Sequence, residues 1–147
     1  MNKRFESPIV LLGARLLSPY IFMFGLYVIF HGHYSPGGGF QGGALLAAAI
    51  LLVRVAGGDK IGDLQLKDKI TSPLGVIGVI IYFGTGIFAM LAGGNFLDYG
   101  VLPFPGVVDP AWARYIGILI IEVGIGAAVM AILVMLYDNM IKGEDYD

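Results

Sequence analysis

The chain has 147 residues, of which 57% are hydrophobic and 14% are charged, and its formal net charge is −2. A soluble domain carries about a quarter charged residues, so much of this surface must face lipid or other protein rather than water. Nucleic-acid binding needs clustered Lys and Arg and is not expected. The absence of cysteine excludes disulfides, thiolate metal sites and cysteine nucleophiles.

Four long apolar runs predict four membrane-spanning helices in a single all-α domain covering residues 1–147, because each span needs about 20 apolar residues. A capping residue and a proline precede each run. The capping side chain accepts a free amide of the first turn, and proline fits the first helical position. These pairs are Ser7-Pro8, Ser35-Pro36, Ser72-Pro73 and Asp109-Pro110, which predict helices at residues 8–30, 36–55, 73–92 and 110–137.

The N-terminal residues are typical of a signal peptide, but the apolar run behind them is too long, so we expect a membrane helix there. Basic residues gather on one side of the predicted bundle, and only Arg114 lies at the opposite side. Cytoplasmic loops are enriched in Lys and Arg, so we expect a multi-pass protein of the cell membrane with both termini in the cytoplasm. The basic residues on that side are Lys3, Arg4, Arg54, Lys60, Lys67, Lys69 and Lys142.

The segment between the first two predicted helices, residues 32–43, is dense in glycine. A spacing of four separates Gly38 from Gly42 and Gly39 from Gly43, and this spacing is typical of close contacts between membrane helices. Alternatively, the helix end is unwound, with free amides beside Gln41 facing an ion path. A dinucleotide-binding loop is excluded, because no strand is predicted before the glycines. The predicted helix-packing motif comprises Pro36, Gly37, Gly38, Gly39, Phe40, Gln41, Gly42 and Gly43.

Two charged residues, Arg15 and Glu122, lie inside the predicted spans and away from their ends. Such charges usually face the bundle interior or a polar cavity. Arg15 lies about 10 Å from its end of the helix and can extend its side chain to the interface. Glu122 lies roughly 10–15 Å from the aromatic residues at the outer surface, too deep for its short side chain to reach water unaided. Glu122 is therefore either a proton or ion site or a structural acid, and a pair with Arg15 remains open.

Two histidines, His31 and His33, follow the first predicted helix at the outer surface. Histidine exchanges protons near neutral pH, so these residues could relay protons, or they could be hydrogen-bonded loop residues. Glu122, His31, His33 and Arg15 are thus the candidates for an ion or proton path. We expect no cofactor and no metal site, because too few ligands lie near the histidines. No set of serine, histidine and carboxylate indicates nucleophilic catalysis.

The run Gly32-His-Tyr-Ser-Pro-Gly-Gly-Gly-Phe-Gln-Gly-Gly43 closely resembles the signature of the MnhB/MrpB-like component of Mrp-type (Mnh-type) multisubunit sodium/proton antiporters, and Glu122-Val-Gly-Ile125 matches the last span of that family. The resemblance implies a small four-helix subunit that is not an enzyme. It would assemble in the bilayer with other membrane subunits, in a complex that exchanges sodium for protons. Related modules occur in membrane-bound hydrogenases and similar reductases. A purely structural scaffold subunit is the alternative, and an autonomous small channel or carrier is a third possibility.

Overall fold

The computed structural model describes residues 7–34, 37–57 and 68–143 of the chain. Within these ranges four helices are long and apolar enough to cross a membrane. The prediction of an all-α chain with four membrane-spanning helices is therefore confirmed for the part that is described. The elements are α1 Pro8–His31, α2 Gly39–Gly57, α4 Asp68–Leu91, the short 3₁₀ helix η1 Tyr99–Val101, and α5 Pro110–Gly143.

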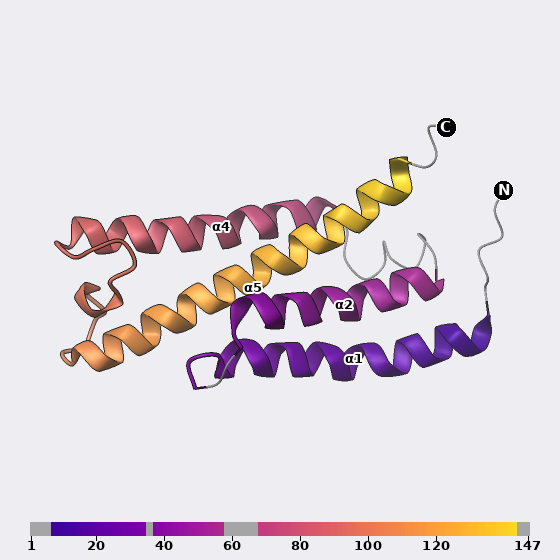
Figure 1. Ribbon diagram of the computed structural model, residues 1–147, viewed down its shortest axis with the longest axis horizontal. Helices are drawn as coiled ribbons and strands as arrows, with labels where there is room; N and C mark the ends of the chain where they lie inside the picture. Colours follow the sequence, from indigo (N-terminus) through magenta and orange to yellow (C-terminus); the bar gives the residue numbers. More distant parts are fainter. Residues whose placement is uncertain (1–6, 35–36, 58–67, 144–147) are drawn as a thin grey trace.

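The helices form a bundle in which α2 lies between α1 and α5, and α4 packs on another side of α5 (Figure 1). The long helix α5 contacts α1, α2, α4 and η1, so it is the element that ties the bundle together. The start of α1 and the end of α5 lie at the same end of the bundle, which we call the terminal end (Figure 1). The turn that follows α1 lies at the opposite end of the bundle, and so does η1 (Figure 1). We call this the glycine end.

The helix starts at Pro8 and Pro110 agree with the sequence. The Ala111 amide donates a hydrogen bond of 2.9 Å to Oδ1 of Asp109, as expected for a capping residue. Ser7 occupies the cap position of α1, although its hydroxyl makes no capping hydrogen bond.

The predicted helix start at Ser72-Pro73 is wrong, because α4 begins at Asp68 and contains Pro73. Proline so near a helix start removes only one intrahelical hydrogen bond, and the fully buried Thr71 anchors this first part of α4 in the bundle. The predicted start at Ser35-Pro36 lies outside the described residues, and the helical residues of α2 begin at Gly39. The last helix continues to Gly143 rather than ending near residue 137.

The helices approach one another most closely at glycines. A Cβ atom at Gly42 would lie 2.8 Å from the carbonyl oxygen of Gly25 in α1, and one at Gly43 would lie 2.6 Å from that of Gly126 in α5. A Cβ atom at Gly78 in α4 would likewise overlap the backbone of α5. Small residues that let backbones approach are typical of contacts between membrane helices. Lipid is as apolar as the side chains, so the hydrophobic effect does not drive the helices together and close packing must do so.

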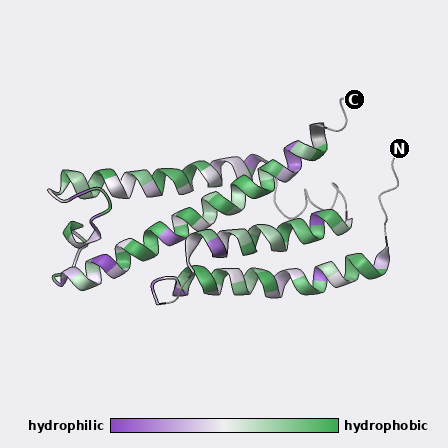
Figure 2. Cartoon of the chain, viewed as in Figure 1, coloured by the Kyte–Doolittle hydropathy of each residue, from purple (hydrophilic) through white to green (hydrophobic). Residues whose placement is uncertain are grey.

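The side chains that fill the space between α1, α2 and α5 form a small core, whereas most large apolar side chains face outward. The helices are apolar around their whole circumference, with isolated polar positions (Figure 2). Ile9 is 82% exposed and Leu91 is 80% exposed, so the outer surface suits lipid or neighbouring membrane subunits. The core residues are Ile29, Leu46, Ala47, Ile50, Met130 and Val134.

Candidate functional site

The carboxyl group of Glu122, in α5, lies directly beneath the backbone of the turn after α1 at the glycine end. A Cβ atom at Gly38 would lie 2.8 Å from Oε1 of Glu122, and one at Gly32 would overlap both carboxylate oxygens. A Cβ atom at Gly39 would collide with the main chain of Glu122. Glycine at these three positions therefore leaves the space that the acid occupies.

One carboxylate oxygen of Glu122 has no hydrogen-bond partner within the described part of the chain. Its Oε2 atom is buried and accepts no hydrogen bond from any residue that the structure describes. An unpaired charge buried in an apolar environment is strongly unfavourable, so this oxygen requires a proton, a cation, a water molecule or a group from another protein. Among the described residues no three His, Asp or Glu side chains are grouped closely enough to hold a metal ion.

The histidines lie at the same end of the bundle as Glu122. The ring of His33 packs against Tyr34, at 4.0 Å between centroids, and edge-on against Tyr115, at 4.5 Å. Both ring nitrogens of His33 are buried and have no hydrogen-bond partner in the described part of the chain. His31 is exposed and stacks on a tyrosine of its own helix. Gly32 lies between the two histidines in the sequence and against the Glu122 carboxyl group in the structure. The turn that carries both histidines is therefore next to this acid.

Tyr99 of η1 is a neighbour of Glu122 that the sequence does not reveal. A Cβ atom at Gly117 would lie 2.7 Å from Cβ of Tyr99, so η1 packs closely on α5. Asp98 holds η1 in shape by accepting a hydrogen bond of 3.2 Å from the Gly100 amide. Burial raises the pKa of the Tyr99 phenol, and Tyr82 and the charge of Glu122 raise it further. Tyr99 is therefore a protonated hydroxyl group within the electrostatic reach of Glu122.

The glycine motif is divided between buried and exposed positions. Gly37, Phe40 and Gln41 are exposed, whereas the other described glycines of the motif are buried. Gly38 has a φ of 132°, a conformation that residues other than glycine rarely adopt. Its carbonyl oxygen accepts a hydrogen bond of 2.9 Å from the Gly42 amide at the start of α2. Residue 36 lies outside the described ranges.

A family model described as a domain related to the MnhB subunit of Na+/H+ antiporter matches residues 9–135. The chain belongs to the MnhB family. The corresponding component of the Na(+)/H(+) antiporter of Alkalihalophilus pseudofirmus is 31% identical to this chain over 144 residues, which cover 94% of this chain and 99% of that protein. An uncharacterised protein of Methanocaldococcus jannaschii is 35% identical over 124 residues, which cover 81% of this chain.

A chain in the structure of the membrane-bound sulfane sulfur reductase, an archaeal respiratory membrane complex, has a similar fold. The TM-score is 0.75 and the sequence identity is 32%, and the match covers 95% of this chain. This MnhB chain spans 60% of that chain and 47% of the Methanocaldococcus relative. Membership in the family, together with the four apolar helices, makes it a multi-pass membrane protein.

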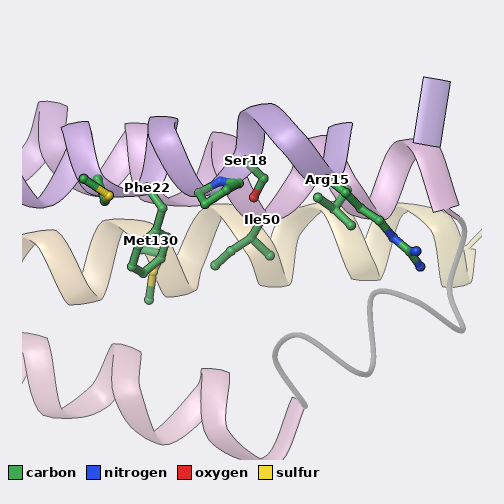
Figure 3. A pocket seen from close by; sticks show the side chains of 8 residues that line it. Arg15, Ser18, Phe22, Ile50 and Met130 are labelled. Carbon is green, nitrogen blue, oxygen red and sulfur yellow. The ribbon is translucent and has the colours of Figure 1, made fainter. Parts of the chain in front are cut away.

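Arg15 lies far from the other candidate residues of this MnhB chain. It precedes Gly32, which contacts Glu122, by 17 residues along α1, a distance of about 25 Å at the rise of an α-helix. The pair between Arg15 and Glu122 that the sequence left open is therefore not formed. Arg15 instead lies at the edge of a hollow between α1, α2 and α5, nearer the terminal end (Figure 3).

The structure also contains a buried ion pair that sequence reasoning missed. Arg54 of α2 is bound to Asp138 of α5, and their side chains are 5% and 13% exposed. The sequence places Arg54 on the cytoplasmic side and predicts that the last helix ends at residue 137, so neither residue is expected inside the bundle. The signal that could have found the pair is that α2 and α5 run toward the same membrane surface and carry opposite charges near that end.

Proposed function

We propose that this chain is a membrane subunit of a multisubunit cation/proton antiporter-type complex, in which Glu122 forms part of a proton or sodium path. The family match and the nearly full-length similarity to a component of a Na(+)/H(+) antiporter support this role. The similarity to a chain of a respiratory membrane complex supports the same kind of module in a redox-driven assembly. The chain itself acts as a non-catalytic subunit.

The buried Oε2 atom of Glu122 is the observation that supports an ion-path role most directly. A carboxyl group at this depth must exchange a proton or bind a cation if it titrates at all. The buried nitrogens of His33 and the phenol of Tyr99 lie at the same end of the bundle as Glu122. In this proposal the two histidines pass protons between Glu122 and the solution, with His31 at the exposed edge.

We further propose that the terminal end faces the cytoplasm and the glycine end faces the outside. The start of α1 and the end of α5 lie at one end of the bundle (Figure 1). The sequence assigns seven of the nine Lys and Arg residues to the side of the membrane that carries both termini. Such a bias marks the cytoplasmic surface. The proposed path through Glu122 then opens toward the outer surface.

A scaffold without an ion-path role is the second candidate, because Glu122 lies inside the helix-packing site itself. Its main chain is in direct contact with Gly39 of α2. The same acid could therefore hold α2 and α5 in register through a neighbouring subunit. Replacing Glu122 with glutamine separates the two functions, because glutamine keeps the volume and the hydrogen bonding but cannot exchange a proton. The measurement is cation-driven proton exchange by the assembled complex in vesicles.

A further inference from the structure

A hollow of about 560 Å³ lies between α1, α2 and α5 in the half of the bundle nearer the terminal end (Figure 3). This volume is in the range of about 300–1,000 Å³ that is typical of ligand sites. Met23 at its rim is 66% exposed, so the hollow opens toward the bilayer. It is far from the Glu122 site and plays no part in the function proposed above.

The floor of the hollow is apolar. Ser18 has a small side chain whose hydroxyl is already used, because it donates a buried hydrogen bond of 2.8 Å to the Ala49 carbonyl oxygen. Phe22 and Met130 close one end of the hollow, and Ile50 lies beneath it (Figure 3). A lining of this kind offers contacts to a hydrocarbon chain and no free hydrogen-bonding side chain to a polar ligand.

The other end of the hollow carries the positive charge of Arg15. Its guanidinium group extends away from the apolar lining, toward the N-terminal end of α1 (Figure 3). No acid pairs with Arg15 among the residues that the structure describes, whereas Arg54 of α2 is paired with Asp138. Arg15 lies about 10 Å along α1 from Pro8, so its long side chain reaches the depth of the lipid headgroups.

We propose that this hollow binds one anionic phospholipid from the leaflet that contains the N-terminal end of α1. The phosphate group pairs with the guanidinium of Arg15, which matches phosphate in a two-pronged hydrogen bond. One acyl chain lies along Pro19, Phe22 and Met130. Basic pockets between membrane helices are known to bind anionic headgroups. We favour a lipid over a protein helix as the occupant because its headgroup always supplies a negative charge at the depth of Arg15. A helix would match the hollow equally well only if it carried an acidic residue at that depth.

The first test compares two arginines in the intact complex, reconstituted in nanodiscs of phosphatidylglycerol and phosphatidylcholine. Lipids that remain bound after extraction in mild detergent are counted by mass spectrometry. We expect Arg15→Gln to lower the preference for phosphatidylglycerol about fivefold, the contribution of one interfacial arginine. Arg114→Gln, the same charge change at the glycine end, should leave the preference unchanged. An unchanged preference in Arg15→Gln, or an equal loss in both variants, would overturn the proposal.

The second test keeps Arg15 intact and probes the occupant directly. A photoreactive p-benzoylphenylalanine at position 23 should form a covalent adduct with phospholipid, detected by its phosphate mass. An adduct with another polypeptide instead would show that a neighbouring subunit covers the hollow and would refute the lipid site. Met23→Trp, which fills the hollow without changing charge, should also reduce bound phosphatidylglycerol, and full retention would contradict the placement of the acyl chain.

Discussion

Arg54 and Asp138, which are 84 positions apart in the sequence, form a buried ion pair that joins α2 to α5 at the terminal end. Two charges in an apolar interior are tolerable only when each neutralises the other, since the loss of one leaves the other without compensation. The pair therefore sets the rotation of α2 against α5 at this end, as the contact of Gly43 with Gly126 does further along the same two helices.

We predict that Asp138→Ala destabilises the bundle by about 3–5 kcal/mol, because it removes the carboxylate that compensates the buried charge of the Arg54 guanidinium. Thermal unfolding of the purified complex in mild detergent measures this loss. The double variant Arg54→Met with Asp138→Leu should recover most of the stability, because no buried charge remains. Asn139→Ala, on the exposed side of the same turn, is the control and should be near neutral. A single variant as stable as the double would argue against the ion pair.

Glu122→Gln should leave assembly of the complex intact and reduce cation-driven proton exchange in vesicles. The amide fills the same space beneath Gly38 but cannot titrate. Glu122→Asp should retain part of the activity with a shifted pH optimum, because the shorter side chain moves the carboxyl group away from the glycine segment.

The matched control for Glu122 is Asp109→Asn, which removes one negative charge at the glycine end and preserves a good helix cap. Its exchange rate should equal that of the unmodified complex. Normal exchange by Glu122→Gln over the whole pH range would eliminate the ion-path role. Failure of that variant to assemble would instead favour the scaffold function.

The glycine crossings predict a graded intolerance of side chains. Gly43→Leu should prevent recovery of the assembled complex, because even a Cβ atom would lie 2.6 Å from the backbone of Gly126. Gly43→Ala should be milder, in the range of about 1–3 kcal/mol for overpacking. Gly84→Leu provides the control, since no atom lies within 4 Å of a Cβ at Gly84. Recovery is measured by the yield of intact complex in mild detergent, and normal yield with Gly43→Leu would refute the packing role.

The pKa of Tyr99 offers a direct report on the charge of Glu122. Burial raises this pKa first, and the charges of its neighbours, including Glu122, add to the shift. Removal of that negative charge stabilises the phenolate, so Glu122→Gln should lower the Tyr99 pKa while leaving it above its ordinary value. Carbon-13 labelling of tyrosine rings, with Tyr99→Phe for assignment, measures the change by NMR. An identical pKa in both proteins would indicate that Glu122 carries no charge when Tyr99 titrates.

The proposed orientation is tested with reporter fusions. A reporter at Asp147 should be active in the cytoplasm, and one inserted beside Asp98, in the connection between α4 and α5, should lie outside. Opposite results at the two positions would invert the orientation. Of the described helices that are long enough to cross a membrane, only α5 lies between Asp98 and Asp147, so the two reporters must lie on opposite sides if α5 crosses the membrane. Reporters on the same side would contradict that crossing.

The membrane class and most of the fold follow from properties of contiguous residues. An apolar run of about 20 residues determines a span wherever it lies in a chain, and the Asp109-Pro110 cap acts within a single turn of helix. The family signature around Gly38 is equally local, which is why the sequence is sufficient to place the chain in the MnhB family. The false start at Pro73 shows the limit of this reasoning, because α4 begins at Asp68, upstream of the local cap signal, and includes the buried Thr71.

Contacts between helices were decided only by the tertiary structure. Neighbouring residues Gly42 and Gly43 face different partners, α1 and α5, because successive side chains on a helix point about 100° apart. Hydropathy does not encode which way each helix is rotated in a bundle that is apolar on all sides. The pairing of Arg54 with Asp138, the position of Glu122 beneath Gly32 and its separation from Arg15 all depend on that rotation and on the register of the crossings.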